Sequence, residues 1–246
     1  DWMIMEIIQA NNWRKPIYFA VTVSNNNKLG LDEYLKMEGL AFRLYPQKVD
    51  SRLDLEKTRH NLWNVYKYRG LTDPTVYKDP NTRKLISNYN AAYFQLALKY
   101  YNELKQPEMA IKTLERADSL VGIQRQGGYR LMAQIYVSMK QYDKAIEKLK
   151  KSLELRPRDW PALITLGDLY NRIGAKQEAI QVFEKIINLT PRNRQEYQIR
   201  AQSFMMLERL YNQKKDYDKL SLLLQRWLKI NPNDKHARKR LELYYE

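Results

Sequence analysis

The sequence predicts a mainly α-helical fold, an α-solenoid of about three to four antiparallel helix pairs that follows a small α/β segment. Three observations predict it. A pattern of large, small and turn residues recurs every 34 residues between Gln126 and Asp234. Within that pattern, alanine and glycine recur where neighbouring helices approach closely. Before residue 78, apolar and polar residues instead alternate in two short runs that are typical of β-strands.

Two consecutive units carry the pattern in full. The first unit contains Tyr129, Met132, Ala133, Tyr136, Tyr142, Ala145, Leu149 and Pro157. The second contains the residues 34 positions later, which are Leu163, Leu166, Gly167, Tyr170, Lys176, Ala179, Phe183 and Pro191. This pattern resembles the tetratricopeptide repeat. The resemblance implies antiparallel helix pairs, each closed by a proline, with small residues at the closest helix contacts and tyrosines and leucines beside them.

Two flanking units are degenerate copies of the same pattern. The upstream copy has Gly122 in place of the closing proline and contains Tyr93, Leu96, Ala97, Tyr100, Ala110, Leu114 and Ala117. The downstream copy follows seven extra residues and contains Phe204, Leu207, Tyr211, Tyr217, Leu224 and Pro232. It has Leu220 and Trp227 where small residues are expected. A final helix from Lys235 to Tyr244 is predicted to cover the apolar end of the array.

The first 46 residues predict two strands and two helices. Residues 1–12 are predicted to form a helix with Ile4, Ile7 and Ile8 on one face. Residues 16–23 and 39–45 are predicted as strands, and between them Asp32 is predicted to cap a short helix through Glu38. Two strands are too few to be stable alone. They are therefore expected either to pack on the first repeats or to pair with strands before Asp1.

Residues 51–68 are predicted to form a further helix, and residues 70–80 a linker with two Asp-Pro turn signals. Asp79 is a predicted N-cap with Pro80 at the first helical position, and the helix that follows is expected to reach Glu103. The predicted domains are therefore an N-terminal α/β segment, residues 1–78, and a repeat array with its capping helix, residues 79–246.

Composition limits the function classes. The chain has 43 basic and 28 acidic side chains, so its net charge is +15, and it has no cysteine. No apolar run approaches the length of a membrane span. The basic residues cluster after the ends of second helices, as at Arg156 with Arg158 and Arg192 with Arg194, where cations favour the helix dipole. Solvated helix edges are the favoured interpretation, with an anionic lipid or polymer as a weaker partner hypothesis and no nucleic acid predicted.

No motif for catalysis or for a cofactor occurs. The two histidines, His60 and His236, lack a second histidine or cysteine at metal-ligand spacing. The acidic pairs Asp32 with Glu33 and Asp54 with Glu56 are interpreted as helix-capping or solvent-facing residues. We therefore predict no catalytic residue, no cofactor and no metal site in this chain.

The N-terminal part carries a second resemblance, in the phrases RKPIYFA (residues 14–20), GLDEYL (30–35), EGLAFRLYP (38–46) and YKDPNTR (77–83). They resemble the bacterial membrane family known as domain of unknown function 2723, also called protein O-mannosyltransferase-like. The resemblance covers about residues 1 to 120. It implies a parent protein with a membrane bundle of the GT-C glycosyltransferase type before Asp1, of which this chain is the soluble C-terminal part. The start at Asp1, without an initiator methionine, fits a fragment or a processed product.

The same resemblance implies a periplasmic location and a lipid-linked sugar donor for the parent enzyme. Its expected catalytic loop lies outside these residues, so no catalytic residue is carried over. The alternative interpretation is a free-standing tetratricopeptide-repeat adaptor with no attached enzyme, which would be cytoplasmic.

The predicted binding site is the concave groove of the array, lined by the first helix of each pair. Its candidate residues are Phe94, Tyr101, Asn102, Arg130, Gln134, Asp168, Asn171, Arg172, Met205, Arg209 and Asn212. Aromatic, amide and guanidinium groups in this mixture favour an extended peptide or a protein segment as the partner. Ile164, Val137 and Asp168 replace the clamp residues of chaperone-binding relatives, which argues against a chaperone tail. The competing interpretation is that a neighbouring segment of the chain fills the groove.

Overall fold

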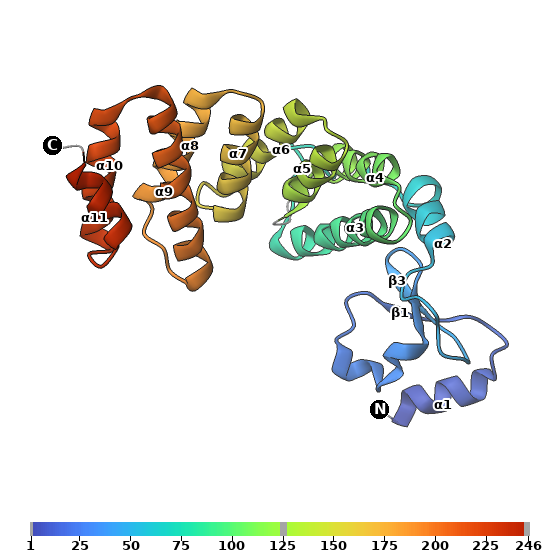
Figure 1. Cartoon of the computed structure of the whole chain (residues 1–246). Coiled ribbons are helices and arrows are strands. Elements are labelled where there is room, and N and C mark those ends of the chain that lie inside the picture. The colour runs from blue at the N-terminus through green and yellow to red at the C-terminus, as the bar shows by residue number, and fades with distance from the viewer. Residues whose placement is uncertain (1, 124–126, 244–246) are drawn as a thin grey trace. The chain divides into compact units, whose positions relative to one another are not determined.

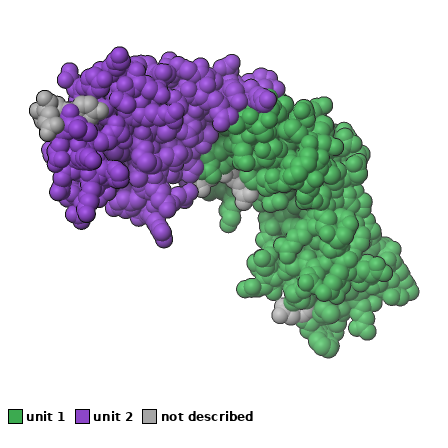
Figure 2. All heavy atoms as spheres, viewed as in Figure 1, with its two compact units in different colours: residues 1–139 green, residues 140–246 purple. Residues whose placement is uncertain are grey.

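The computed structural model describes residues 2–123 and 127–243. They form the predicted tetratricopeptide-repeat-like solenoid of helices with a small β-sheet near the N-terminus (Figure 1). The chain divides into two compact units, unit 1 with residues 1–139 and unit 2 with residues 140–246 (Figure 2). The predicted domain boundary near residue 78 lies inside unit 1 and stays a prediction.

Unit 1 begins with α1 (Trp2–Asn11) and three short strands, β1 (Ile17–Ala20), β2 (Leu35–Met37) and β3 (Ala41–Leu44). The strand order is β1-β3-β2, and both pairings are antiparallel. A small apolar cluster fills the space between α1 and the sheet, and it consists of Phe19, Leu35 and Leu44 with Ile4, Ile8, Ile17, Val23, Leu31, Tyr34 and Phe42 packed against it. The helix and the two predicted strands are therefore confirmed.

The prediction of a short helix from Asp32 to Glu38 is wrong. Only a 3-10 turn, Leu31–Tyr34, forms there, and it begins after Gly30 in the left-handed conformation without a side-chain cap from Asp32. Residues 35–37 form the third strand because Leu35 and Met37 are buried while Lys36 between them is not. Alternating burial needs a period of two, which a strand provides and a helix does not.

The predicted helix over residues 51–68 is shorter than expected. It forms α2 (Leu55–His60), which the carboxylate of Asp54 caps by accepting from the backbone N–H of Lys57 at 3.0 Å. A π-helical turn, η3 (Asn61–Val65), follows, and the chain is extended from Tyr66. The hydroxyl of Tyr66 then accepts from the backbone N–H of Leu40, beside β3.

The first repeat helices of unit 1 are α3 (Pro80–Leu98), the π turn η4 (Lys99–Glu103), α4 (Pro107–Leu120) and α5 (Gly128–Ser138). The predicted cap at Asp79 is confirmed, since its carboxylate accepts from the N–H groups of Asn81 and Thr82. After α4, Gly122 has φ +72°, which a glycine adopts without strain, so it ends the helix as a proline does in the regular copies.

Residues 51–68 pack against the first repeat helices. The hydroxyl of Tyr93 on α3 donates to the carbonyl of Leu62 at 3.0 Å and lies 3.0 Å from the hydroxyl of Tyr68. The guanidinium of Arg116 on α4 donates to the carbonyl of Trp63 and stacks over its ring. The repeats are therefore contacted by residues 51–68, whereas the two predicted strands are joined in one sheet with β2 of the same unit.

Unit 2 contains the remaining helices of the described residues. They are α6 (Tyr142–Leu155), α7 (Trp160–Arg172), α8 (Lys176–Asn188), α9 (Arg194–Lys214), α10 (Tyr217–Ile230) and α11 (Lys235–Glu242). The helices α6 and α8 end just before Pro157 and Pro191, as predicted. The predicted capping helix is confirmed as α11, and its predicted end at Tyr244, like the predicted start of the repeat at Gln126, lies outside the described residues.

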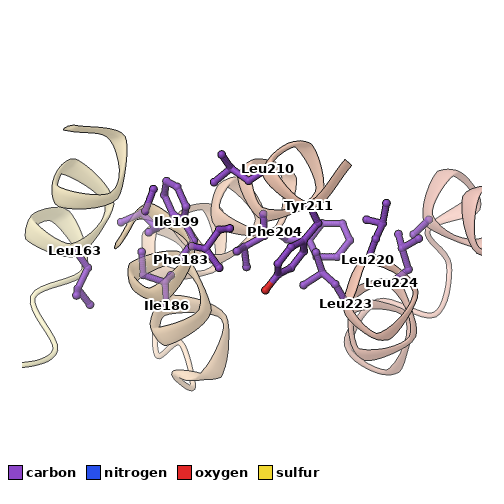
Figure 3. Close-up of a cluster of buried hydrophobic side chains, with 14 of the residues drawn as sticks. Leu163, Phe183, Ile186, Ile199, Phe204, Leu210, Tyr211, Leu220, Leu223 and Leu224 are labelled. Carbon is purple, nitrogen blue, oxygen red and sulfur yellow. The ribbon is translucent and has the colours of Figure 1, made fainter. Parts of the chain in front are cut away.

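Small residues stand where helices touch. A Cβ atom added at Gly167 on α7 would lie 2.5 Å from a ring carbon of Phe183 on α8, closer than any side chain tolerates. Ala133, Ala145 and Ala179 are fully buried. Figure 3 shows the apolar side chains of α8, α9 and α10 turned toward one another in one continuous cluster, which is the core of unit 2.

One tyrosine contact recurs along the array. Tyr136 on α5 donates to Glu115 on α4, and Tyr211 on α9 donates to Glu184 on α8. The tyrosine at the equivalent place in the middle repeat, Tyr170, instead has the ammonium of Lys150 5.9 Å from its ring centroid. Each tyrosine therefore joins the first helix of one pair to the second helix of the previous pair, which explains why tyrosine recurs at this position.

Candidate functional site

Six of the predicted groove residues lie on α7 and α9 of unit 2, two helices that contact each other although α8 separates them in the sequence. Both helices bury one side in the core, through Leu163, Leu166 and Gly167 on α7 and through Leu207 and Leu210 on α9. We call the other sides of these two helices the α7–α9 face, and it carries Asp168, Asn171 and Arg172 from α7 and Met205, Arg209 and Asn212 from α9. Asp168 and Asn171 are half-buried, and the other four residues are exposed.

Sequence spacing explains why these side chains share a face. Asn171 and Arg172 follow Asp168 by three and four residues, and Arg209 and Asn212 follow Met205 by four and seven residues. Residues at these intervals lie on one side of an α-helix. All six predicted groove residues of unit 2 are therefore brought onto the α7–α9 face.

Asp168 is the least solvated ionisable group of this face. Burial raises the pKa of its carboxyl above the ordinary value, and the charge of Arg172 one turn away opposes that shift. Within residues 2–123 and 127–243 its carboxylate makes no hydrogen bond and no ion pair of the usual length. A half-buried carboxylate without a donor is costly, and a cationic or N–H group of a ligand would relieve that cost.

Arg172 is held beside Asp168 by an aromatic neighbour. Its guanidinium carbon lies 5.7 Å from the ring centroid of Tyr142 on α6, and its Nη1 is 3.5 Å from the Tyr142 hydroxyl. The guanidinium is therefore stacked and partly ordered while its outer N–H groups stay exposed. Sequence reasoning missed Tyr142, although its place at the start of α6, one repeat helix before α7, could have indicated the contact.

The α9 side of the face is exposed. Met205 has 59% of its surface accessible, and Arg209 and Asn212 are exposed as well. Between them Glu208 pairs with Arg240 on α11, with Oε1 and Nη1 2.6 Å apart. Burial raises the pKa of Glu208, and Arg240 opposes the shift. Glu208 is therefore used in joining α9 to α11 and is not available to a ligand.

The other five predicted residues belong to unit 1. Phe94 lies on α3 and Tyr101 and Asn102 lie on the π turn η4, whereas Arg130 and Gln134 lie on α5. Asn102 and Gln134 are exposed, and the other three are half-buried. The π turn changes the helical register at Tyr101, so its side chain does not follow the regular groove spacing that the repeat predicts.

Unit 1 has a depression of about 430 Å³ around Glu38. The carboxylate of Glu38 accepts from Lys57 at 2.7 Å and from the hydroxyls of Tyr18 and Tyr45 at 3.1 Å, and Arg43 is 3.8 Å away. This buried acid is fully satisfied by groups of its own unit. It joins the sheet to α2, and its role is structural.

Two of the basic residues near the ends of the second helices donate to backbone carbonyls of the chain. Arg158 donates to the carbonyl of Thr190 at 2.9 Å, and Arg238 donates to the carbonyl of Pro232 at 2.7 Å. Both carbonyls lie in the turns that follow a helix, where backbone acceptors lack intrahelical partners. These guanidinium groups therefore help to satisfy the turns between helices.

In the described part of the chain, no helix combines the length and apolar character that crossing a membrane requires. Across residues 2–123 and 127–243, no three His, Asp or Glu side chains are grouped so that they could hold a metal ion.

Family profiles match three segments of the chain. The profile described as TMEM260-associated domain 2 matches residues 1–62. Two tetratricopeptide-repeat profiles match residues 91–120 and 136–203. No curated protein matches the sequence.

Solved structures with a similar fold share little sequence with this chain. A MamA fragment, residue 41 to the end, from Desulfovibrio magneticus RS-1 is 18% identical over 63% of this chain and 82% of its own, with a TM-score of 0.45. The C-terminal part of a TPR repeat-containing protein from Cytophaga hutchinsonii is 20% identical over 64% and 61%, with a TM-score of 0.46. YrrB, a TPR protein, is 17% identical over 66% and 82%, with a TM-score of 0.43.

These structural likenesses are weak, so the assignment rests on the family profiles and on the packing described above. The profiles cover the first upstream copy, much of both regular units and the start of the downstream copy. Residues 91–120 and 136–203 are therefore tetratricopeptide repeats, and the array that contains them is a protein-interaction domain.

Proposed function

We propose that this chain is the non-catalytic, partner-binding part of a membrane glycosyltransferase-like protein, and that the α7–α9 face binds an extended peptide or protein segment. The observation that carries the proposal is the half-buried carboxylate of Asp168, which accepts no hydrogen bond from any described residue and lies on a face where Arg172, Arg209 and Asn212 are exposed. Such a group is stabilised by a ligand that brings a donor to it.

The chemistry of the face suits a peptide. The amides of Asn171 and Asn212 can each donate to and accept from a peptide backbone, which fixes an extended chain without reading its side chains. Arg172 and Arg209 can each bind a carboxylate through two parallel N–H groups. Met205 offers an exposed, flexible apolar contact. We expect a preferred peptide to place a lysine or an arginine opposite Asp168 and acidic residues on either side of it.

Selection from a library of displayed dodecapeptides tests this preference. The full chain should enrich peptides with a basic residue next to acidic ones, and Asp168→Asn should lose the basic preference while keeping the acidic one. Arg209→Gln should weaken the selected peptides by about tenfold, the value of one charged hydrogen-bonding contact. Gln181→Ala on the exposed side of α8 is the matched control. Selected peptides that bind Asp168→Asn and Arg209→Gln as tightly as the parent would place the site elsewhere.

The membrane context is a separate part of the proposal. It is supported by the resemblance of residues 14–20, 30–35, 38–46 and 77–83 to the membrane family. We propose that a bundle of membrane helices precedes Asp1 and that this chain lies on the extracytoplasmic side, the periplasm. The reading frame upstream of Asp1 tests it. Ten or more apolar spans are expected, and a start codon at Met3 or Met5 would contradict the attachment.

A further inference from the structure

The helix α1 exposes apolar side chains that the fold does not use. Ile4 and Ile8 face inward and pack on the apolar cluster of the sheet. On the other side, Trp2 is 78% exposed, Met3 is 71% exposed and Ile7 is 53% exposed. Helical spacing places these three within one outward-facing sector, so the helix is apolar on both sides. A large exposed apolar patch of this kind indicates an interaction surface.

Tryptophan marks both ends of this surface. The chain has five tryptophans. Trp160 is buried, Trp227 stacks on Phe204, and Trp63 lies under Arg116. Trp2 and Trp13, which stand at either end of α1, are instead exposed.

Exposed positive charge follows the helix directly. The backbone N–H of Arg14 donates to the carbonyl of Asn11 at 2.9 Å, and the side chain of Asn11 donates to the carbonyl of Lys15 at 2.7 Å. These bonds hold both basic residues in a tight turn at the end of α1. Neither side chain has an ion pair within residues 2–123 and 127–243. The one acid of α1, Glu6, accepts a hydrogen bond from the indole of Trp2.

We propose that α1 is a membrane-contact element that lies in the interface of an anionic lipid bilayer. Trp2, Met3 and Ile7 would enter the boundary between headgroups and acyl chains, Trp13 would lie at headgroup level, and Arg14 and Lys15 would contact lipid phosphates. The exposed apolar face and its two tryptophans match the polarity of a bilayer interface. Arg14 and Lys15, which have no ion pair among the described residues, match its negative charge. The proposal does not depend on the α7–α9 face, and it places lipid contact on α1 rather than on the basic helix edges of unit 2.

Flotation of the full chain with equimolar phosphatidylglycerol–phosphatidylcholine vesicles tests the proposal. The parent should float with these vesicles and more weakly with pure phosphatidylcholine. The triple variant Trp2→Ser, Met3→Ser, Ile7→Ser should lower the partition coefficient by at least about tenfold, because three large apolar groups no longer enter the membrane. The matched control is Leu155→Ser with Leu222→Ser, which removes apolar side chains that are 58% and 56% exposed in unit 2, and it should bind as the parent does.

Two further variants separate the charge from the apolar contact and from folding. Arg14→Gln with Lys15→Gln should lower binding to the anionic vesicles by about fivefold per charge and leave binding to neutral vesicles unchanged. Trp2→Phe, Met3→Leu, Ile7→Leu should keep binding, which shows that loss in the serine variant does not come from unfolding. Circular dichroism of every variant should match the parent, because Ile4 and Ile8 are kept.

Several results would overturn the proposal. One is a parent chain that stays unbound with the anionic vesicles. Another is equal flotation of the parent and the serine variant, or a loss of binding on Arg156→Gln with Arg158→Gln instead, which would locate contact at the helix edges. A parent that sediments as a dimer and a serine variant that sediments as a monomer, with neither binding vesicles, would show that a second copy covers α1.

Discussion

The helix pairs α7–α8 and α9–α10 occupy corresponding places in the repeat but are packed by different residues. In the first pair, Gly167 on α7 makes room for the ring of Phe183 on α8. In the second pair, 41 residues later, Glu208 stands in place of the glycine and Leu224 in place of the aromatic ring. A smaller side chain on the second helix thus accompanies a larger one on the first.

At two neighbouring positions of the second helix, the second pair instead has the larger side chain. Ala179 is fully buried in α8, and its counterpart Leu220 is fully buried in α10. Ile186 is replaced by Trp227, whose ring stacks on Phe204 with the centroids 4.4 Å apart. The difference teaches that the repeat requires a filled interface between the helices, and that the residue types which fill it can be exchanged as a set.

Leu220→Ala should have the largest effect on stability. It introduces the alanine found at Ala179 in the first pair, but Leu224 does not supply the aromatic ring that Phe183 supplies there. Leu220 is fully buried, so its truncation leaves a cavity and should lower the free energy of unfolding by about 3 to 4 kcal/mol. Urea unfolding followed by circular dichroism measures the loss. The exposed Leu222→Ala on the same helix is the control, and a similar loss in both variants would contradict the packing described for α10.

Gly167→Val should have the second-largest effect on stability. A valine places its Cβ on the ring of Phe183, and relieving that overlap should cost about 3 kcal/mol of unfolding free energy. Gln181→Val, which introduces the same side chain on the exposed side of α8, controls for helix propensity. If Gly167→Val unfolds at the same urea concentration as Gln181→Val, the close approach of α7 and α8 is wrong.

Ala179→Leu imitates the second pair inside the first and should cost about 2 kcal/mol by overpacking. Adding Phe183→Leu supplies the smaller partner found at Leu224. The two changes together should therefore destabilise less than the sum of the two single changes, by about 1 kcal/mol of coupling. A double-mutant cycle in urea measures the coupling. Strict additivity would show that the two positions are not exchanged as a set.

Asp234→Ala should have the smallest effect and a distinct dependence on pH. Asp234 caps α11 by accepting from the N–H of Ala237 and also accepts from the indole of Trp227, and these bonds hold the pKa of its carboxyl below the ordinary value. A group with a lowered folded-state pKa stabilises above its unfolded value and loses that effect as the pH falls through its folded value.

The loss at pH 7 should therefore be about 1 kcal/mol, a typical value for an N-cap. It should shrink as the pH falls below 3.8, the ordinary pKa of an aspartate, until the parent and the variant unfold alike. Urea midpoints at several pH values measure this. Asp218→Ala, an exposed acid in the first turn of α10, is the control. A loss that stays constant down to acidic pH would mean that the carboxylate charge of Asp234 contributes nothing.

Much of the fold was predictable because it depends on local rules. The 34-residue spacing, the prolines after α6 and α8, the Asp79 cap and the glycine that ends α4 all act within a few residues of the chain. Helical periodicity likewise decides which side of α7 or α9 each of the six predicted groove residues occupies.

The mispredicted elements depend on distant partners. Residues 35–37 form a strand because β3 and the core beneath it are present, and Tyr66 leaves the helix because its hydroxyl reaches Leu40. The lengthening of α9 is similar, since the seven extra residues could have formed a loop. They extend the helix at its beginning, where Ile199 is buried in the core of unit 2.

The amino-acid sequence alone determined the repeat, its helix ends and the faces that each helix leaves open, because these follow from spacing and from capping over a few residues. Only the tertiary structure decided that Asp168 lies half-buried without a donor among the described residues, that Glu208 is bound to Arg240, and that Trp2 and Ile7 are exposed. Burial and pairing arise from residues that are distant along the chain, and no local pattern records which of them will meet.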